Sequence, residues 1–174
     1  MKPSLTILLV ASLNLTACTA SKLTTTPVDV DGMENSVLAG ELLIGSQPSV
    51  VALSQFANEG YRVIVSTRGE TELQWDEKAI VDSLGMQFVK IPMPGPVTEI
   101  TDEQIERFDY AMNRGNGAVV LHCASGNRAS GLWAVWLVEK EGLAPQKALD
   151  LAEKTGMKSI RALVLRRLGL PPEE

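Results

Sequence analysis

Residues 121–131 read Leu-His-Cys-Ala-Ser-Gly-Asn-Arg-Ala-Ser-Gly, and this segment decides how the chain is interpreted. Apolar runs precede it at 118–120 and follow it at 132–138, which predicts a buried strand, a short loop and a helix. The backbone N–H groups of such a loop, the helix N-terminus and the fork of Arg128 together suit an anion. The same groups would lower the pKa of the Cys123 thiol. The segment therefore predicts an anion site that contains a cysteine nucleophile.

The rest of the chain alternates strand-like and helix-like segments. Two capping boxes, Thr71…Gln74 and Thr101…Gln104, predict helix starts. This alternation predicts a single α/β domain with a largely parallel central sheet flanked by helices, and anion sites in such sheets lie at the carboxyl ends of strands. The predicted strands are 37–45, 62–66, 87–91 and 118–122, and the predicted helices are 50–59, 72–84, 102–114, 128–140, 145–154 and 158–168.

The N-terminal segment has the pattern of an export signal. A short basic start precedes the mostly apolar stretch 5–15, which is too short to span a bilayer. The sequence Leu-Thr-Ala-Cys at 15–18 resembles the cleavage box of bacterial lipoproteins. We therefore expect a signal peptide over 1–17, a lipidated Cys18 with a flexible tether over 18–36, and a folded domain over 37–174. An ordinary secretory signal cut near Ala20 is the alternative.

This pattern predicts an exported protein, held by Cys18 to a membrane of the bacterial cell envelope and facing the periplasm.

Composition excludes a disordered or fibrous chain, because 45% hydrophobic and 21% charged residues among 174 indicate a globular protein. The net charge of −5, with no block of Lys or Arg, argues against nucleic-acid binding. The chain has one histidine and two cysteines, and once Cys18 is lipidated the free Cys123 and His122 are too few for a zinc site. We expect neither a metal nor a cofactor.

His122-Cys123…Arg128 resembles the signature of cysteine-dependent protein tyrosine and dual-specificity phosphatases. The segment 43–49 resembles the opening strand of dual-specificity phosphatases, and 63–68 resembles their second strand. The likeness covers roughly 37–141 and is greatest to the bacterial branch related to the phosphatase-like domain of β-lactamase hydrolase-like proteins. The resemblance implies a phosphatase-like fold and a phosphorylated substrate.

The resemblance also implies roles for single residues. Cys123 would be the nucleophile, Arg128 the bidentate clamp on phosphate oxygens, and His122 the residue that orients the cysteine. A buried structural histidine is the alternative for His122. The expected substrate-binding residues are those of the loop, Ala124, Ser125, Gly126 and Asn127, together with Arg68 at the end of the second predicted strand.

Arg68 has a second interpretation, an ion pair with Glu70 or Glu72.

A phosphatase also needs a general acid for the leaving oxygen. In the family this acid is an Asp on a loop before the cysteine, and in this chain the corresponding region, 91–102, contains Glu99 and Asp102. Glu99 is favoured because Asp102 also suits the first turn of a helix.

Two features depart from the phosphatase signature. Four residues separate Cys123 from Arg128 where the signature has five, and this spacing also resembles the loop of single-domain rhodaneses. Ala129 stands where phosphatases usually have a Ser or Thr that assists phosphocysteine breakdown, with Ser130 one position later. Three hypotheses follow: a phosphatase of phosphate monoesters, phosphotyrosine among them; a sulfurtransferase with a Cys123 persulfide; and a non-catalytic anion-binding module.

Overall fold

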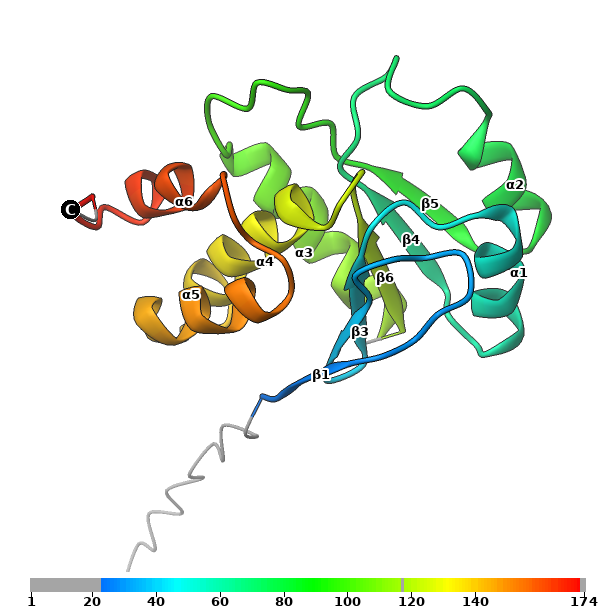
Figure 1. Cartoon of the computed structure of the whole chain (residues 1–174), viewed down its shortest axis with the longest axis horizontal. Helices are drawn as coiled ribbons and strands as arrows, with labels where there is room; N and C mark the ends of the chain where they lie inside the picture. Colours follow the sequence, from blue (N-terminus) through cyan, green and yellow to red (C-terminus); the bar gives the residue numbers. More distant parts are fainter. Residues whose placement is uncertain (1–22, 117, 173–174) are drawn as a thin grey trace, which may run out of the picture.

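A six-stranded sheet forms the centre of the computed structural model, which describes residues 23–116 and 118–172 (Figure 1). The strand order is β1-β2-β3-β6-β4-β5. Strands β3, β6, β4 and β5 run parallel, and β1 and β2 add two antiparallel strands at one edge. This is the expected α/β architecture with a mostly parallel sheet. The strands are β1 Thr25–Pro27, β2 Val37–Ala39, β3 Leu42–Gly45, β4 Val63–Ser66, β5 Gln87–Lys90 and β6 Val119–His122.

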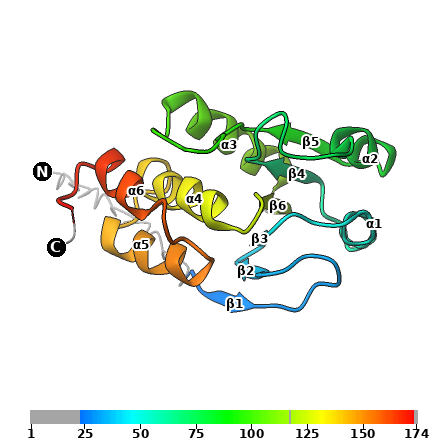
Figure 2. The ribbon, with the colours of Figure 1, turned by 45° about the horizontal axis from the view of Figure 1, so that its top comes forward.

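Helices cover both faces of this sheet (Figures 1 and 2). The two faces belong to separate apolar clusters, because neighbouring strand residues such as Ile64 and Val65 point to opposite sides. One cluster includes α1 and α2, and the other includes α3 to α6. The helices are α1 Val50–Asn58, α2 Glu77–Ser83, α3 Asp102–Gly115, α4 Asn127–Glu139, α5 Pro145–Lys154 and α6 Arg161–Arg167.

Helix α4 is the most deeply buried helix of the described chain. All nine residues from Ala129 to Leu137 are buried, as its nearly uniform apolar sequence predicts. It contacts α3, α5 and α6 as well as β3 and β6. Gly131 lets the segment before α6 approach closely, because a Cβ there would lie 2.7 Å from Ile160 Cγ2. A helix fixed on all sides gives a rigid support to the loop at its N-terminus.

Two predicted elements are wrong in detail. The strand 37–45 is a hairpin of β2 and β3, which turns at Gly40 with φ of +65°. The helix 72–84 begins only at Glu77, where the Asp76 side chain accepts the Ala79 N–H at 3.0 Å. The Thr71…Gln74 capping box therefore does not form, whereas the second one, Thr101…Gln104, does.

The predicted tether, residues 18–36, is also wrong where the structure describes it. Thr25–Pro27 pairs with β2, and Met33 is buried against the α1 face of the sheet. The apolar contacts of this segment outweigh its tether-like composition. The predicted signal peptide 1–17 and Cys18 lie outside the described residues. Within residues 23–116 and 118–172, no helix has the length and apolar character needed to cross a bilayer.

Candidate active site

Cys123 lies directly after β6, at the carboxyl edge of the parallel strands. Its Sγ accepts the backbone N–H of Gly126 at 3.1 Å and that of Ser125 at 3.5 Å. Gly126 caps the N-terminus of α4 with φ of +90°, a left-handed conformation that favours glycine, and its N–H points to the sulfur. A bridge between Ser46 and Ser125 ties the loop to the end of β3. The segment therefore forms the predicted cradle around the thiol.

The electrostatics of this cradle favour the thiolate. Burial of Cys123, which is only 1% exposed, opposes ionisation. The backbone N–H groups of Ala129, Ser125 and Arg128, and the positive charge of Arg128, outweigh that effect and lower the pKa of Cys123 below its ordinary value. The thiolate is stabilised chiefly by main-chain dipoles, which do not depend on side-chain identity.

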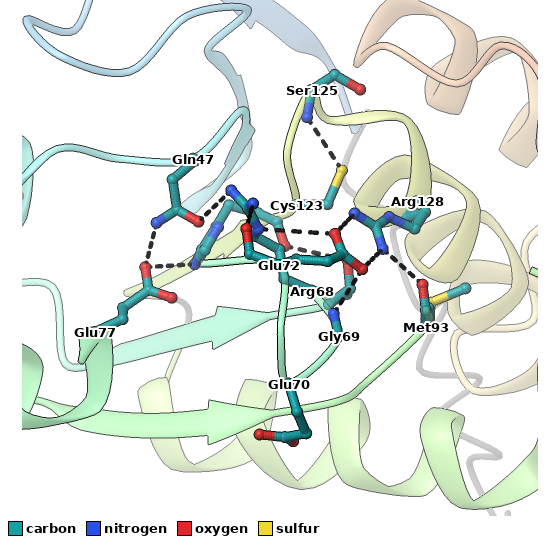
Figure 3. Close-up of polar contacts among 12 residues, drawn as sticks. Gln47, Arg68, Gly69, Glu70, Glu72, Glu77, Met93, Cys123, Ser125 and Arg128 are labelled. Atoms are coloured by element: carbon teal, nitrogen blue, oxygen red, sulfur yellow. Dashed lines mark hydrogen bonds and ion pairs between the residues drawn. The ribbon is translucent and has the colours of Figure 1, made fainter. Parts of the chain in front are cut away.

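Arg128 extends beside the cysteine and is held by Glu72 (Figure 3). Its Nη1 donates to Glu72 Oε1 at 2.7 Å and its Nη2 to Glu72 Oε2 at 2.6 Å, a fork-to-fork pair. Nη1 also donates to the carbonyl of Met93 at 2.7 Å, and the Gly69 N–H donates to Glu72 Oε1 at 2.8 Å. The guanidinium is thus fixed from two loops, after β4 and after β5.

Glu72 belongs to the site, although the sequence predicted it at the start of a helix and only as an ion-pair partner of Arg68. Its hydrogen bonds to Arg128 lower its pKa to about 2, with further lowering by the Gly69 N–H and by the charges of Arg128 and Arg68. A carboxyl so acidic does not supply a proton near neutral pH, so its role is to orient Arg128. The signal that could have found it is its position three residues after Gly69, in a short turn after a strand.

Arg68, expected to bind substrate, contacts the Glu72 turn. It donates to the Glu72 carbonyl oxygen through Nη2 and to Gln47 Oε1 through Nη1 at 3.2 Å. Its Nε lies 3.8 Å from Glu72 Oε2, so the predicted alternative of an ion pair with Glu72 is confirmed. Glu70 pairs with Lys90 and points away from this group (Figure 3). Arg68 also lines a hollow of about 480 Å³ on the side of β4 and β5.

His122 is fully buried and faces a buried carboxylate. Its Nε2 lies 3.1 Å from Oε1 of Glu77, which is 5% exposed. Neither ring nitrogen of His122 bonds a backbone carbonyl, and this close contact with Glu77 is the polar contact of the ring. Burial raises the pKa of Glu77, but hydrogen bonds from His122, Gln47 and Ser66 and the charge on His122 outweigh it, so the pKa is lowered. Glu77 was not singled out from the sequence, because it looked like an ordinary helix residue.

The structure separates the two predicted acids. Asp102 begins α3, and its 86% exposed side chain pairs with Arg167, which also binds Glu139 at the end of α4. The Asp102 carboxylate is thus engaged by a cation of α6. Glu99 is exposed on the loop after β5, the loop that also carries the carbonyl contacting Arg128.

The remaining loop residues have two kinds of role. Ala124 and Ser125 are exposed, and their main chain forms the rim of the cradle. The Asn127 side chain does not face the thiol: it donates to Ser159 Oγ at 2.8 Å and accepts the Lys158 N–H at 2.7 Å. It therefore braces the loop against the segment before α6.

Ser130 was the possible substitute for the missing Ser or Thr at Ala129. Its hydroxyl is buried and donates to the Thr155 carbonyl at 2.8 Å, while Thr155 Oγ1 donates to Ser130 at 2.9 Å. Ser130 thus belongs to the packing between α4 and α5. Among residues 23–116 and 118–172, no group of three His, Cys, Asp or Glu residues could hold a metal ion.

A sequence profile for the family described as DSP-PTPase phosphatase fused to NAD⁺ kinase matches residues 21–163. The chain belongs to this family. The β-lactamase hydrolase-like protein of Xylella fastidiosa (strain Temecula1) is 35% identical over 99 residues, which cover 54% of this chain and 22% of the relative. The protein of the same name from Agrobacterium fabrum is 29% identical over 99 residues. The chain thus matches about a fifth of the length of these relatives.

Solved structures of phosphatases share the fold. The active form of Tk-PTP superposes with a TM-score of 0.63 at 22% identity, covering 74% of this chain and 91% of that one. TpbA of P. aeruginosa in complex with pTyr gives a TM-score of 0.62 at 19% identity, covering 84% and 91%. PTPMT1 gives 0.60 at 16% identity, covering 72% and 87%. The chain therefore has the fold of these phosphatases.

Proposed function

We propose that the protein hydrolyses phosphate monoesters, phosphotyrosine among them, through a phosphocysteine on Cys123. The observation that carries the proposal is the cradle itself. Backbone N–H groups converge on Cys123 Sγ, and the guanidinium of Arg128 is fixed beside it by Glu72. Such an arrangement stabilises a thiolate and, above it, the equatorial oxygens of a transferring phosphoryl group.

In the proposed reaction, the thiolate attacks phosphorus, the S–P bond forms and the bond to the ester oxygen breaks. The leaving oxygen takes a proton from a general acid, for which we propose Glu99, because it lies exposed on the loop after β5. Water then attacks phosphorus and gives a proton to the Glu99 carboxylate, the S–P bond breaks, phosphate leaves and the thiolate is restored. Arg128 holds the phosphoryl oxygens through both steps.

The test is hydrolysis of p-nitrophenyl phosphate and of a phosphotyrosine peptide by the full chain and by Cys123→Ser. We expect Cys123→Ser to reduce hydrolysis to background, because a serine hydroxyl, unlike the Cys123 thiol, stays protonated in such a cradle and is a weak nucleophile. Cys18→Ser, which changes the other cysteine, is the matched control and should retain activity.

The four-residue spacing favours a second candidate, sulfur transfer. Incubation with thiosulfate followed by mass spectrometry would then add about 32 Da to the peptide that carries Cys123. That gain, with no phosphate release, would replace the phosphatase proposal. Protection of Cys123 from alkylation by phosphate, with neither reaction, would instead indicate an anion-binding module.

We also propose that the chain is exported and held to a cell-envelope membrane through lipid on Cys18, as its Leu-Thr-Ala-Cys box suggests. Cys18→Ala should then move the protein from the membrane fraction to the soluble fraction of cells. Membrane association that persists in the variant after removal of the signal peptide would contradict the anchor.

A further inference from the structure

Glu77 is a buried carboxylate at the first position of α2, and its contacts extend toward the cysteine. Its Oε1 accepts from Gln47 Nε2 at 2.5 Å and lies 3.1 Å from His122 Nε2. A buried carboxylate is destabilising unless polar partners compensate for the lost water, and here His122, Gln47 and Ser66 do so. The carboxylate in turn fixes the ring of the residue directly before Cys123.

Gln47, from the loop between β3 and α1, connects this pair to the opposite side of the thiol. While its amide nitrogen donates to Glu77, its amide oxygen accepts from Arg68 Nη1 at 3.2 Å. Arg68 then binds the carbonyl of Glu72, whose carboxylate binds Arg128. Figure 3 shows Gln47 and Glu77 on one side of the cysteine, Arg68 and Glu72 in the middle, and Arg128 on the other side.

We propose that Gln47 and Glu77 are positioning residues for the anion site. Glu77 orients His122. Gln47 links Glu77 to Arg68, and Arg68 in turn contacts the Glu72 turn that holds Arg128. One polar relay thus positions both His122 and Arg128, the two residues that flank Cys123. The inference rests on the anion site of the proposed function, but its test does not require hydrolysis.

The chemistry of the relay requires an amide at position 47. One end must donate to the Glu77 carboxylate and the other must accept from the Arg68 guanidinium. A carboxylate at position 47 would still accept from Arg68 but would meet Glu77 at the distance of a hydrogen bond, where like charges repel. A leucine of similar size would satisfy neither end. Gln47→Glu together with Glu77→Gln would exchange the two groups and restore the contact.

The measurement is alkylation of Cys123 in the full chain by iodoacetate and by iodoacetamide, followed on the tryptic peptide that carries Cys123. The same thiolate attacks both reagents and displaces iodide, so the fraction ionised cancels in the ratio of the two rates. The ratio then reports how well Arg128 and the loop attract an anionic reagent. Gln55→Leu is the matched control, because Gln55 lies on α1, where its amide nitrogen donates to the exposed Glu59 at 2.7 Å.

We expect Gln47→Leu and Gln47→Glu each to lower the ratio about tenfold, the effect of losing one hydrogen bond to a charged group. The exchanged pair, Gln47→Glu with Glu77→Gln, should restore the ratio to within about threefold of the natural chain, and Gln55→Leu should leave it unchanged.

Ratios unchanged in both Gln47 variants would overturn the relay. So would a reduced ratio that the exchanged pair fails to restore, because the polar contact would then not be the cause. Thermal unfolding of each variant shows whether it is folded, and the alkylation ratios are compared among the folded variants. If the ratios follow expectation while no phosphate ester is hydrolysed, the relay stands and the proposed phosphatase activity fails.

Discussion

The Glu72–Arg128 pair predicts how stability depends on pH. Glu72 has a pKa of about 2 in the folded chain against 4.5 without its partners, a difference of about 2.5 pH units. At about 1.36 kcal/mol per unit this corresponds to about 3.4 kcal/mol as an upper bound. The Glu72 side chain is 27% exposed, so screening by water reduces its contribution to the free energy of unfolding to about 1–2 kcal/mol.

The sign follows from the lowered pKa. The contribution of Glu72 is fully present above about pH 4.5 and is lost as the pH falls through about 2, because protonation removes the partner of Arg128. Glu72→Gln should therefore lower the free energy of unfolding by about 1–2 kcal/mol at pH 7. At pH 3 more than half of this difference should be gone. Urea denaturation of both proteins at the two pH values measures it.

Glu70→Gln is the matched control for this experiment. Glu70 lies two residues away, is 73% exposed and pairs with Lys90 on the surface, so its loss should change stability little at either pH. In the same Glu72→Gln protein, kcat/KM for an aryl phosphate should fall about tenfold or more, because Arg128 loses its orientation. Equal stability of Glu72→Gln and the natural chain at pH 7, or a difference that persists at pH 3, would refute the assignment.

Two further outcomes are expected. Gly126→Ala should raise the pKa of the Cys123 thiol, because φ of +90° strains alanine by about 1–3 kcal/mol and relief of that strain would turn the N–H away from sulfur. The pH dependence of alkylation measures this pKa, and an unchanged profile would mean that this N–H contributes little. Glu99→Gln should slow hydrolysis of alkyl phosphates more than that of nitrophenyl phosphate, and Asp102→Asn should not, since Asp102 pairs with Arg167; the reverse pattern would make Asp102 the acid.

Elements could be predicted from the sequence where the local residue pattern and the burial of the element agree. The stretch 118–138 predicted β6, the cradle and α4 to within one residue at each boundary, because a buried strand and a fully apolar helix leave few alternatives. The Thr101…Gln104 box likewise predicted the start of α3, since both of its hydrogen bonds are local. Cys123 and Arg128 follow from this part of the chain.

The residues that orient those two could not be predicted in the same way. Thr71…Gln74 has the same capping pattern as the box that forms, yet Glu72 is drawn to Arg128, 56 positions away, and the helix begins later. Glu77 at the start of α2 and His122 at the end of β6 are in contact although they lie far apart in the chain, and neither local sequence marks them as partners. Long-range polar contacts override local propensity here, and spacing along the chain carries no record of them.

The same contacts explain how a loop of only four residues between Cys123 and Arg128 can be rigid. The loop is anchored on one side by the Ser46–Ser125 bridge and on the other by Asn127, which binds the segment before α6. Behind it, α4 is buried on all sides. An anion entering this cradle meets N–H groups that are already oriented, so little conformational entropy is lost on binding. Arg128 is the exception, because it extends from this rigid base and depends on Glu72 for its direction. Substitutions in the supporting turn after β4 should therefore affect anion recognition more than those on the exposed rim at Ala124.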